Sequence, residues 1–179
     1  MRAISGRKIS YALLTVECMI REISPSDFDA VFRVVNDAAQ AYRGIIPDDR
    51  WKEPYMPKEE LKEEIDAGIE FYGWIENCDI IGVMGIQRVK DVTLIRHAYV
   101  LTEHQRKGIG GRLLKHLIDL TESHDILIGT WEDADWAIRF YEKHGFELVP
   151  PKEKKRLLSE YWDVPDRQIE TSVVLKLEK

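Results

Sequence analysis

The fold of this chain is decided by the stretch Gln105-Arg106-Lys107-Gly108-Ile109-Gly110-Gly111-Arg112-Leu113-Leu114. An apolar run from Leu94 to Leu101 precedes it, and an amphipathic helical pattern from Gly108 to Ser123 follows it. This order predicts a strand, a glycine-rich turn and the start of a helix. Such a turn aims several backbone N–H groups at one point, with the positive end of the helix dipole behind them. It therefore suits a phosphate group.

A pyrophosphate ligand and an ordinary helix cap are the two alternatives for this turn. Gly108 and Gly110 have no Cβ atoms to keep a pyrophosphate away from the backbone. A dinucleotide fingerprint fits poorly because it needs a third glycine at position 113, where this chain has Leu. A P-loop also fits poorly, because Lys107 precedes the glycine instead of following it. Further donors and positive charge come from Gln105, Arg106, Lys107 and Arg112.

Two motifs in this chain resemble a known family. The turn reads Gln105-x-x-Gly108-x-Gly110, which resembles the acetyl-CoA pyrophosphate loop of the GNAT superfamily of N-acetyltransferases. Residues 137–146 read Ala-Ile-Arg-Phe-Tyr-Glu-Lys-His-Gly-Phe and look like the segment that closes the core of that family. The resemblance covers roughly residues 19–149. It implies an acyltransferase of the GNAT fold that uses acetyl-CoA as co-substrate.

Length and composition narrow the class of protein. The 179 residues suffice for one domain with a proper core, so we expect an N-terminal extension, residues 1–18, and a single domain, residues 19–179. The formal charge of -6 disfavours nucleic acid as a partner. Cys18 and Cys78 show no Cys-x-x-Cys spacing, so neither a disulfide framework nor a metal site is expected. No segment suggests a membrane span, and we expect a cytoplasmic protein.

The remaining pattern predicts a mixed α+β fold with a largely antiparallel central sheet. The apolar run at residues 126–130 needs burial on both faces, so it should be a central strand. We expect it to lie parallel to the strand before the glycine turn, because a helix connects the two. The family resemblance implies that this parallel pair splays apart. The expected elements are about four helices, near 24–39, 58–67, 108–123 and 134–144, and strands near 19–23, 70–76, 80–88, 92–101, 126–130 and 146–149.

The C-terminal segment supports three further expectations. Residues 150–155 read as a charged, solvated linker, and residues 156–162 as a short helix. Residues 168–177 alternate like a final strand. This strand either adds at the sheet edge beside residues 146–149 or exchanges with another subunit, so a homodimer is one of two alternatives.

The family resemblance implies a set of contacts with the acetyl-CoA donor. In the family, the strand before the glycine loop splays away from its neighbour, and its free backbone groups form hydrogen bonds with the pantetheine arm. Alignment on the glycine loop places residues 99–101 of this chain at that point. The N–H groups around Val100 would also polarise the acetyl carbonyl. Many members carry Asn where this chain has Ala134, so that contact is absent or comes from Asp133 or Asp135. The expected cofactor-binding residues are Tyr99, Val100, Leu101, Gln105, Arg106, Lys107, Gly108, Ile109, Gly110, Gly111, Arg112 and Tyr141.

Acyl transfer from a thioester to an amine needs an acid for the leaving thiolate and a base for the amine. By the resemblance, Tyr141 is the expected general acid, since a phenol of pKa about 10 is close enough to a thiol of about 8.5. The alternative is an amphipathic-helix aromatic whose hydroxyl only reaches water. The base is undetermined: His97, Glu132 and Asp133 are candidates. A half-buried strand histidine and helix-capping carboxylates are the structural alternatives.

The acceptor depends on the irregular segment 42–57, which is rich in aromatic and charged residues. We interpret it as a wall of the substrate pocket, although its aromatics would equally serve to cover the edge of the core. Arg43 would grip a carboxylate on an amino-acid-like acceptor. Asp48, Asp49 and Glu53 would instead favour a cationic one. The expected substrate-binding residues are Tyr42, Arg43, Trp51 and Tyr55.

Three functions are therefore open. The leading one is an N-acetyltransferase that acts on a small amine. A protein lysine or N-terminal acetyltransferase is the second, and it would need an open groove in place of a closed pocket. A regulatory module that binds acyl-CoA without transferring the acyl group is the third.

Overall fold

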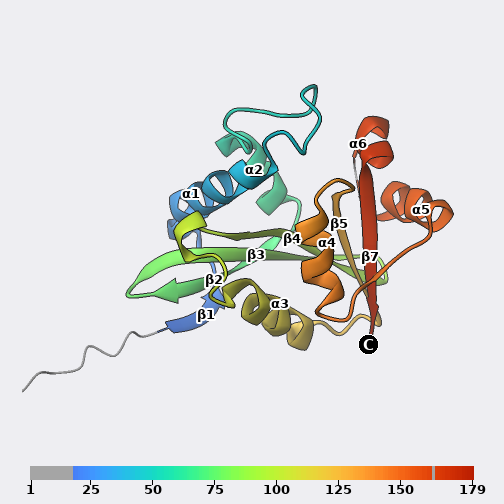
Figure 1. Ribbon diagram of the computed structural model, residues 1–179. Helices are drawn as coiled ribbons and strands as arrows, with labels where there is room; N and C mark the ends of the chain where they lie inside the picture. The colour runs from blue at the N-terminus through green and yellow to red at the C-terminus, as the bar shows by residue number, and fades with distance from the viewer. Residues whose placement is uncertain (1–17, 163) are drawn as a thin grey trace, which may run out of the picture.

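The computed structural model describes residues 18–162 and 164–179. Their strands form a seven-stranded sheet in the order β1-β2-β3-β4-β5-β7-β6 (Figure 1). Neighbouring strands are antiparallel except for β4 and β5, which confirms the predicted mixed fold. The N-terminal extension predicted for residues 1–18 lies, apart from Cys18, outside the described residues. The strands are β1 (Cys18–Glu22), β2 (Glu70–Glu76), β3 (Asp79–Val89), β4 (Val92–Val100), β5 (Asp125–Trp131), β6 (Glu147–Leu148) and β7 (Ser172–Glu178).

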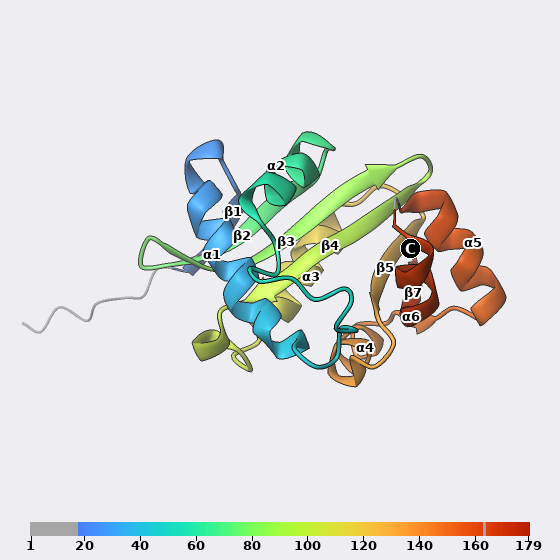
Figure 2. The same ribbon diagram turned by 90° about the horizontal axis from the view of Figure 1, so that it is seen from above.

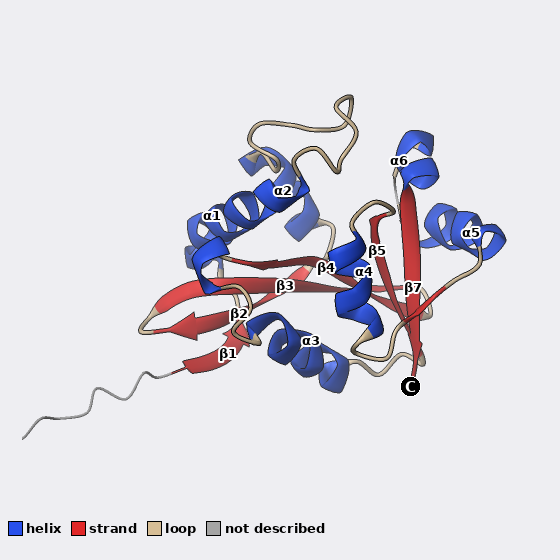
Figure 3. Ribbon diagram, viewed as in Figure 1, coloured by secondary structure: helices blue, strands red, loops and turns tan. Residues whose placement is uncertain are grey.

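The described residues also form six α-helices (Figure 3). The sequence pattern predicted four of them and the second half of α5, as a short helix at residues 156–162, but not α6. Helices α1 and α2 lie on one side of the sheet and α3 on the other, while α5 and α6 lie beside β7. None of the helices in the described ranges is long and apolar enough to cross a membrane. The helices are α1 (Phe28–Ala38), α2 (Lys58–Asp66), α3 (Ile109–Leu120), α4 (Asp135–Glu142), α5 (Pro151–Tyr161) and α6 (Asp166–Thr171), with short 3-10 turns η1 (Pro25–Asp27), η2 (Ala39–Tyr42) and η3 (Thr102–His104).

The main core forms between the sheet and the apolar faces of α1 and α3. Each helix buries residues three or four positions apart, as an amphipathic helix does. The loop after β4 is fixed to α1 as well, because the N–H and hydroxyl of Thr102 donate to Asp37 at 2.7 and 2.9 Å. The core residues of the two helices are Val31, Val34, Val35 and Ala38 of α1 and Ile109, Leu113, Leu114 and Leu117 of α3.

The parallel pair β4 and β5 splays apart halfway along its length. Pairing runs from Val92 opposite Asp125 to Ile95 opposite Ile128 and then stops. Both strands continue beyond that point, β4 to Val100 and β5 to Trp131. The facing backbone edges of these two strand ends are therefore free of each other.

The C-terminal segment differs from the prediction in two ways. Residues 150–155 are not a linker: Pro151 begins α5, which buries Leu157, Leu158 and Tyr161 in a second core cluster. The sequence pattern predicted only the second half of α5, as the short helix at residues 156–162, because the buried apolar residues of α5 all lie in that half. Strand β7 is not an edge strand either, since it lies between β5 and β6 and leaves β6 at the edge. It pairs with strands of its own chain.

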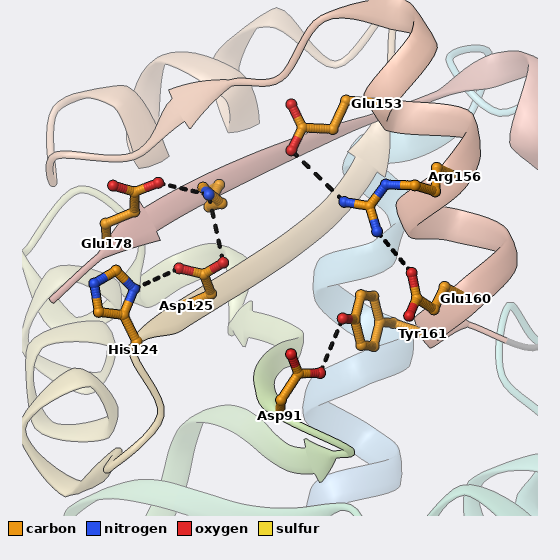
Figure 4. Close-up of polar contacts among 9 residues, drawn as sticks. Asp91, His124, Asp125, Glu153, Arg156, Glu160, Tyr161 and Glu178 are labelled. Atoms are coloured by element: carbon orange, nitrogen blue, oxygen red, sulfur yellow. Dashed lines mark hydrogen bonds and ion pairs between the residues drawn. The ribbon is translucent and has the colours of Figure 1, made fainter.

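Helix α5 is fixed to the sheet by polar contacts as well as by burial (Figure 4). The Tyr161 hydroxyl donates to Asp91 at 2.9 Å, which ties the end of α5 to the β3–β4 hairpin. Along the helix, Arg156 donates to Glu160 at 2.7 Å. Exposed ion pairs of that kind add little stability, so the buried apolar side chains do most to hold α5 in place. Seen from above, α5 and α6 lie together against β7 (Figure 2).

Candidate active site

The glycine loop has the backbone geometry of an anion-binding turn. Helix α3 begins at Ile109, directly after Gly108, whose φ of 80° lies in the left-handed region that favours glycine. The first N–H groups of a helix have no acceptor within the helix, so those of Ile109, Gly110 and Gly111 are free to bind a ligand. At the other end of the loop, the Gln105 amide donates to the Val100 carbonyl at 3.2 Å. This contact ties the loop to the end of β4.

A cavity of about 620 Å³ lies in front of this loop, between α3, α4 and the end of β4. Three predicted cofactor-binding residues do not line it. Leu101 and Ile109 are buried in the core, and Lys107 is exposed. The predicted residues that do line it are Tyr99, Val100, Gln105, Arg106, Gly108, Gly110, Gly111, Arg112 and Tyr141.

The sequence reasoning missed three aromatic side chains that line the same cavity, Trp136, Phe140 and His144. They recur every four residues, so they share one face of α4 and the turn after it. This spacing was the signal that could have found them. His144 also explains Gly111, because a Cβ atom there would lie 2.8 Å from its Nε2.

A second cavity, of about 130 Å³, lies where β4 and β5 splay apart. Its walls come from both strands, from the loop that holds Tyr42 and Tyr55, and from the C-terminal segment. The two cavities share four lining residues, so they meet at one place. The shared residues are Tyr42, Ala98, Tyr99 and Tyr141.

Tyrosine hydroxyls dominate the place where the cavities meet. The Tyr99 ring lies 6.5 Å from that of Tyr42 and 6.3 Å from that of Tyr55. Tyr141 is buried, and burial raises the pKa of its phenol well above the usual value. Burial likewise raises the pKa of Tyr42 and Tyr99. These phenols are therefore neutral at physiological pH and can donate hydrogen bonds.

His97 lines the smaller cavity from a bulge in β4. Its φ of 51° is in the left-handed region, which turns its side chain out of the regular strand pattern. Its ring stacks on Phe71, with centroids 5.6 Å apart. Its buried Nε2 has no hydrogen-bond partner and lies 3.5 Å from Glu64.

Glu64 of helix α2 lies beside His97 and pairs with Arg96, both in β4. Its carboxylate accepts from Arg96 at 2.9 Å, and Arg96 also donates to Gln87 at 3.0 Å. Burial raises the pKa of Glu64, but His97 and Arg96 outweigh it and hold the pKa below its usual value. Glu64 is therefore ionised. Nothing in the sequence signalled Glu64, because Arg96 is distant from it along the chain.

Comparison with known proteins agrees with this geometry. Residues 32–146, more than half of the chain, match the acetyltransferase (GNAT) family. The chain belongs to that family. It is therefore an acyltransferase.

Solved GNAT structures share the fold at low sequence identity. PaiA N-acetyltransferase from Thermoplasma acidophilum, in complex with coenzyme A, is 19% identical, with a TM-score of 0.68 over 91% of this chain and 99% of that one. An acetyltransferase from Elizabethkingia anophelis with acetyl-CoA bound is 21% identical, with a TM-score of 0.61 over 90% and 98%. An N-acetyltransferase for a ribosomal-protein alanine, from Escherichia coli, is 18% identical, with a TM-score of 0.63 over 90% and 94%. At these identities the likeness supports the fold alone.

Several predicted site residues of this GNAT protein lie away from both cavities. Glu132 and Asp133 are exposed and line neither one. The predicted acceptor contact Arg43 is also exposed and pairs with Glu53 at 3.4 Å. Trp51 packs at 5.8 Å on the ring of Tyr55 but does not reach the cavity lining itself. The described residues contain no group of three or more potential ligands placed for a metal ion.

Proposed function

We propose that this GNAT protein transfers the acetyl group of acetyl-CoA to the primary amine of a small molecule. One observation carries the proposal: the large and the small cavity meet at Tyr42, Ala98, Tyr99 and Tyr141. A donor in the first cavity and an acceptor in the second would face each other there. Positioning of this kind removes much of the entropic barrier to a reaction between two molecules.

The donor side offers partners for each part of acetyl-CoA. The glycine loop suits the pyrophosphate, because its amides and the dipole of α3 favour an anion. The backbone of β4 beyond Ile95 has no strand partner on the β5 side and can pair with the pantetheine arm. An N–H group near Val100 would polarise the acetyl carbonyl, a contribution of about 3 kcal/mol to transition-state stabilisation. The coenzyme A and acetyl-CoA complexes of the two structural neighbours support this assignment.

The reaction then needs two proton transfers. The amine nitrogen attacks the thioester carbonyl carbon, the C–N bond forms, and the C–S bond breaks. Tyr141, which lines both cavities, gives its proton to the leaving sulfur. His97, at the wall of the small cavity, takes the proton of the amine directly or through a water molecule. Glu132 and Asp133 are exposed outside the cavities and have no part in this scheme.

The other two functions have less support in the geometry. A protein acceptor, like that of the Escherichia coli neighbour, has to present its amine through an open groove. Here the acceptor cavity is small and is walled on one side by the C-terminal segment. A module without transfer would not need a buried phenol between two cavities.

Thiol release from acetyl-CoA tests the proposal across small amines and lysine-containing peptides. We expect release at least about tenfold faster with the best small amine than with any peptide. Faster release with peptides would establish a protein acceptor. Tight binding of acetyl-CoA without release to any amine would leave the regulatory module.

A further inference from the structure

We propose that the acceptor is a small primary amine without a carboxylate, and that the C-terminal segment α5–α6 limits its size. This inference rests on the proposed function and narrows its substrate class. It is carried by the volume, the wall and the charge balance of the smaller cavity.

The volume sets an upper limit on the acceptor. The cavity measures about 130 Å³. An engineered protein cavity of about 150 Å³ binds benzene, so this one holds a group of roughly that size or less. A short amine fits entirely, whereas a peptide chain does not.

Five of the sixteen residues that line this cavity lie beyond position 146, where the family match ends. Leu158 and Trp162 contribute from α5 and its end, Gln168 from α6, and Ser172 from β7. The indole of Trp162 covers the backbone of β5, because a Cβ atom added at Gly129 would lie 3.6 Å from the ring. Trp162 thus closes the cavity on this side.

The charge balance excludes a carboxylate. Arg96 lines the cavity, but its positive charge is already compensated by Glu64 at 2.9 Å. Arg43, the residue expected to grip a carboxylate, is exposed and pairs with Glu53. A carboxylate that entered would lose its water without gaining an unpaired counter-charge, which is costly.

Neutral polar groups, in contrast, find partners in the wall. Thr130, Gln168 and Ser172 line the cavity together with the neutral tyrosines. Hydroxyls and amides of this kind can both donate and accept. The acceptor class that fits is a short primary amine whose other end is apolar or carries a hydroxyl or amide group.

A matched pair of amines tests the charge argument. β-Alaninamide and β-alanine have the same length and differ in the charge of one end. We expect the amide to have a kcat/KM at least about 100-fold higher in thiol release. It should also bind the coenzyme-A-loaded protein more tightly in calorimetry. Equal values, or a preference for β-alanine, would overturn the inference.

The variant Trp162→Ala tests the size limit with propylamine and 2-phenylethylamine. We expect the ratio of kcat/KM for the larger amine to that for the smaller one to rise at least about tenfold, because the wall opens. Trp162→Phe should give an intermediate ratio and provides a second test if the alanine variant does not fold. Leu157→Ala is the matched control, since Leu157 is buried in the same helix but does not line the cavity. An unchanged ratio in both Trp162 variants, or the same rise in the control, would overturn the size limit.

Amine binding in calorimetry and thiol release from acetyl-CoA together distinguish a failure of this inference from a failure of the proposed function. Discrimination in binding without thiol release would reject acetyl transfer and keep the acceptor class. Thiol release with equal rates for the matched pair would reject the acceptor class and keep acetyl transfer.

Discussion

The proposed donor and acceptor halves of the site are built in opposite ways. The donor cavity is lined mainly by two short parts of the chain, residues 98–115 and 136–144. The acceptor cavity is assembled from the loop after α1, from β4 and β5, and from the C-terminal segment. The donor half can therefore be recognised by a local motif. The acceptor half exists only after distant segments have packed together.

Tyr141 lies where the halves meet, so its loss should stop turnover and leave both binding sites intact. We expect Tyr141→Phe to lower kcat by roughly 100- to 1,000-fold, the range for loss of a general acid. Cofactor affinity should stay within about twofold, because the ring remains. Stopped-flow thiol release and calorimetry check the two values. An unchanged kcat would remove Tyr141 from the mechanism.

The substitution Gly108→Val should impair only the donor half, by weakening the binding of acetyl-CoA. A β-branched residue at a φ of 80° is strained by roughly 1–3 kcal/mol, so the loop should leave its binding geometry. We expect acetyl-CoA affinity to fall by up to about 100-fold in calorimetry. Gly68→Val is the matched control: its φ of 95° brings the same strain far from the cofactor cavity. Retained affinity in the Gly108 variant would contradict the phosphate-loop assignment.

The substitution His97→Asn should impair only the acceptor half, by slowing the reaction of the amine. Asparagine tolerates the left-handed conformation, so the bulge should be preserved. We expect kcat/KM for the amine to fall by roughly 10- to 30-fold, because water replaces the base less effectively. Acetyl-CoA affinity should not change. Steady-state kinetics check this, with the exposed residue His124 changed to Asn as control. A fall equal to that of the control would show that another group accepts the proton.

The smallest effect is expected from Glu64→Gln, which removes the charge that supports His97 and Arg96. The folded-state pKa of Glu64 lies below its unfolded value, so its contribution is present above about pH 4.3 and is lost as pH falls through the folded pKa. We expect the variant to be about 1 kcal/mol less stable at neutral pH, with the difference shrinking in strong acid.

Urea denaturation at pH 7 and near pH 3 measures the stability difference that Glu64 makes. Glu63→Gln is the control, because Glu63 lies exposed on the same helix. A difference that stays constant over this range, or an equal loss in the control, would contradict the role of Glu64.

The fold was predictable where apolar periodicity and glycine placement agreed. Strand β2 has the bounds Glu70–Glu76 that the sequence indicated, and α3 follows Gly108 as expected. Prediction failed in the C-terminal segment, where charged residues mask the first half of α5. The position of β7 inside the sheet was also missed, because strand order depends on long-range pairing that no local pattern contains.

The sequence by itself determined the donor half: the glycine loop, the helix behind it, and the segment that carries Tyr141. These residues act through local backbone geometry, which neighbouring residues specify. Only the tertiary structure decided the acceptor half. It brings Trp162 over Gly129 and Glu64 against Arg96, and it leaves Arg43 outside the cavity. Such contacts follow from burial of distant apolar faces against one sheet, which no single stretch of sequence encodes.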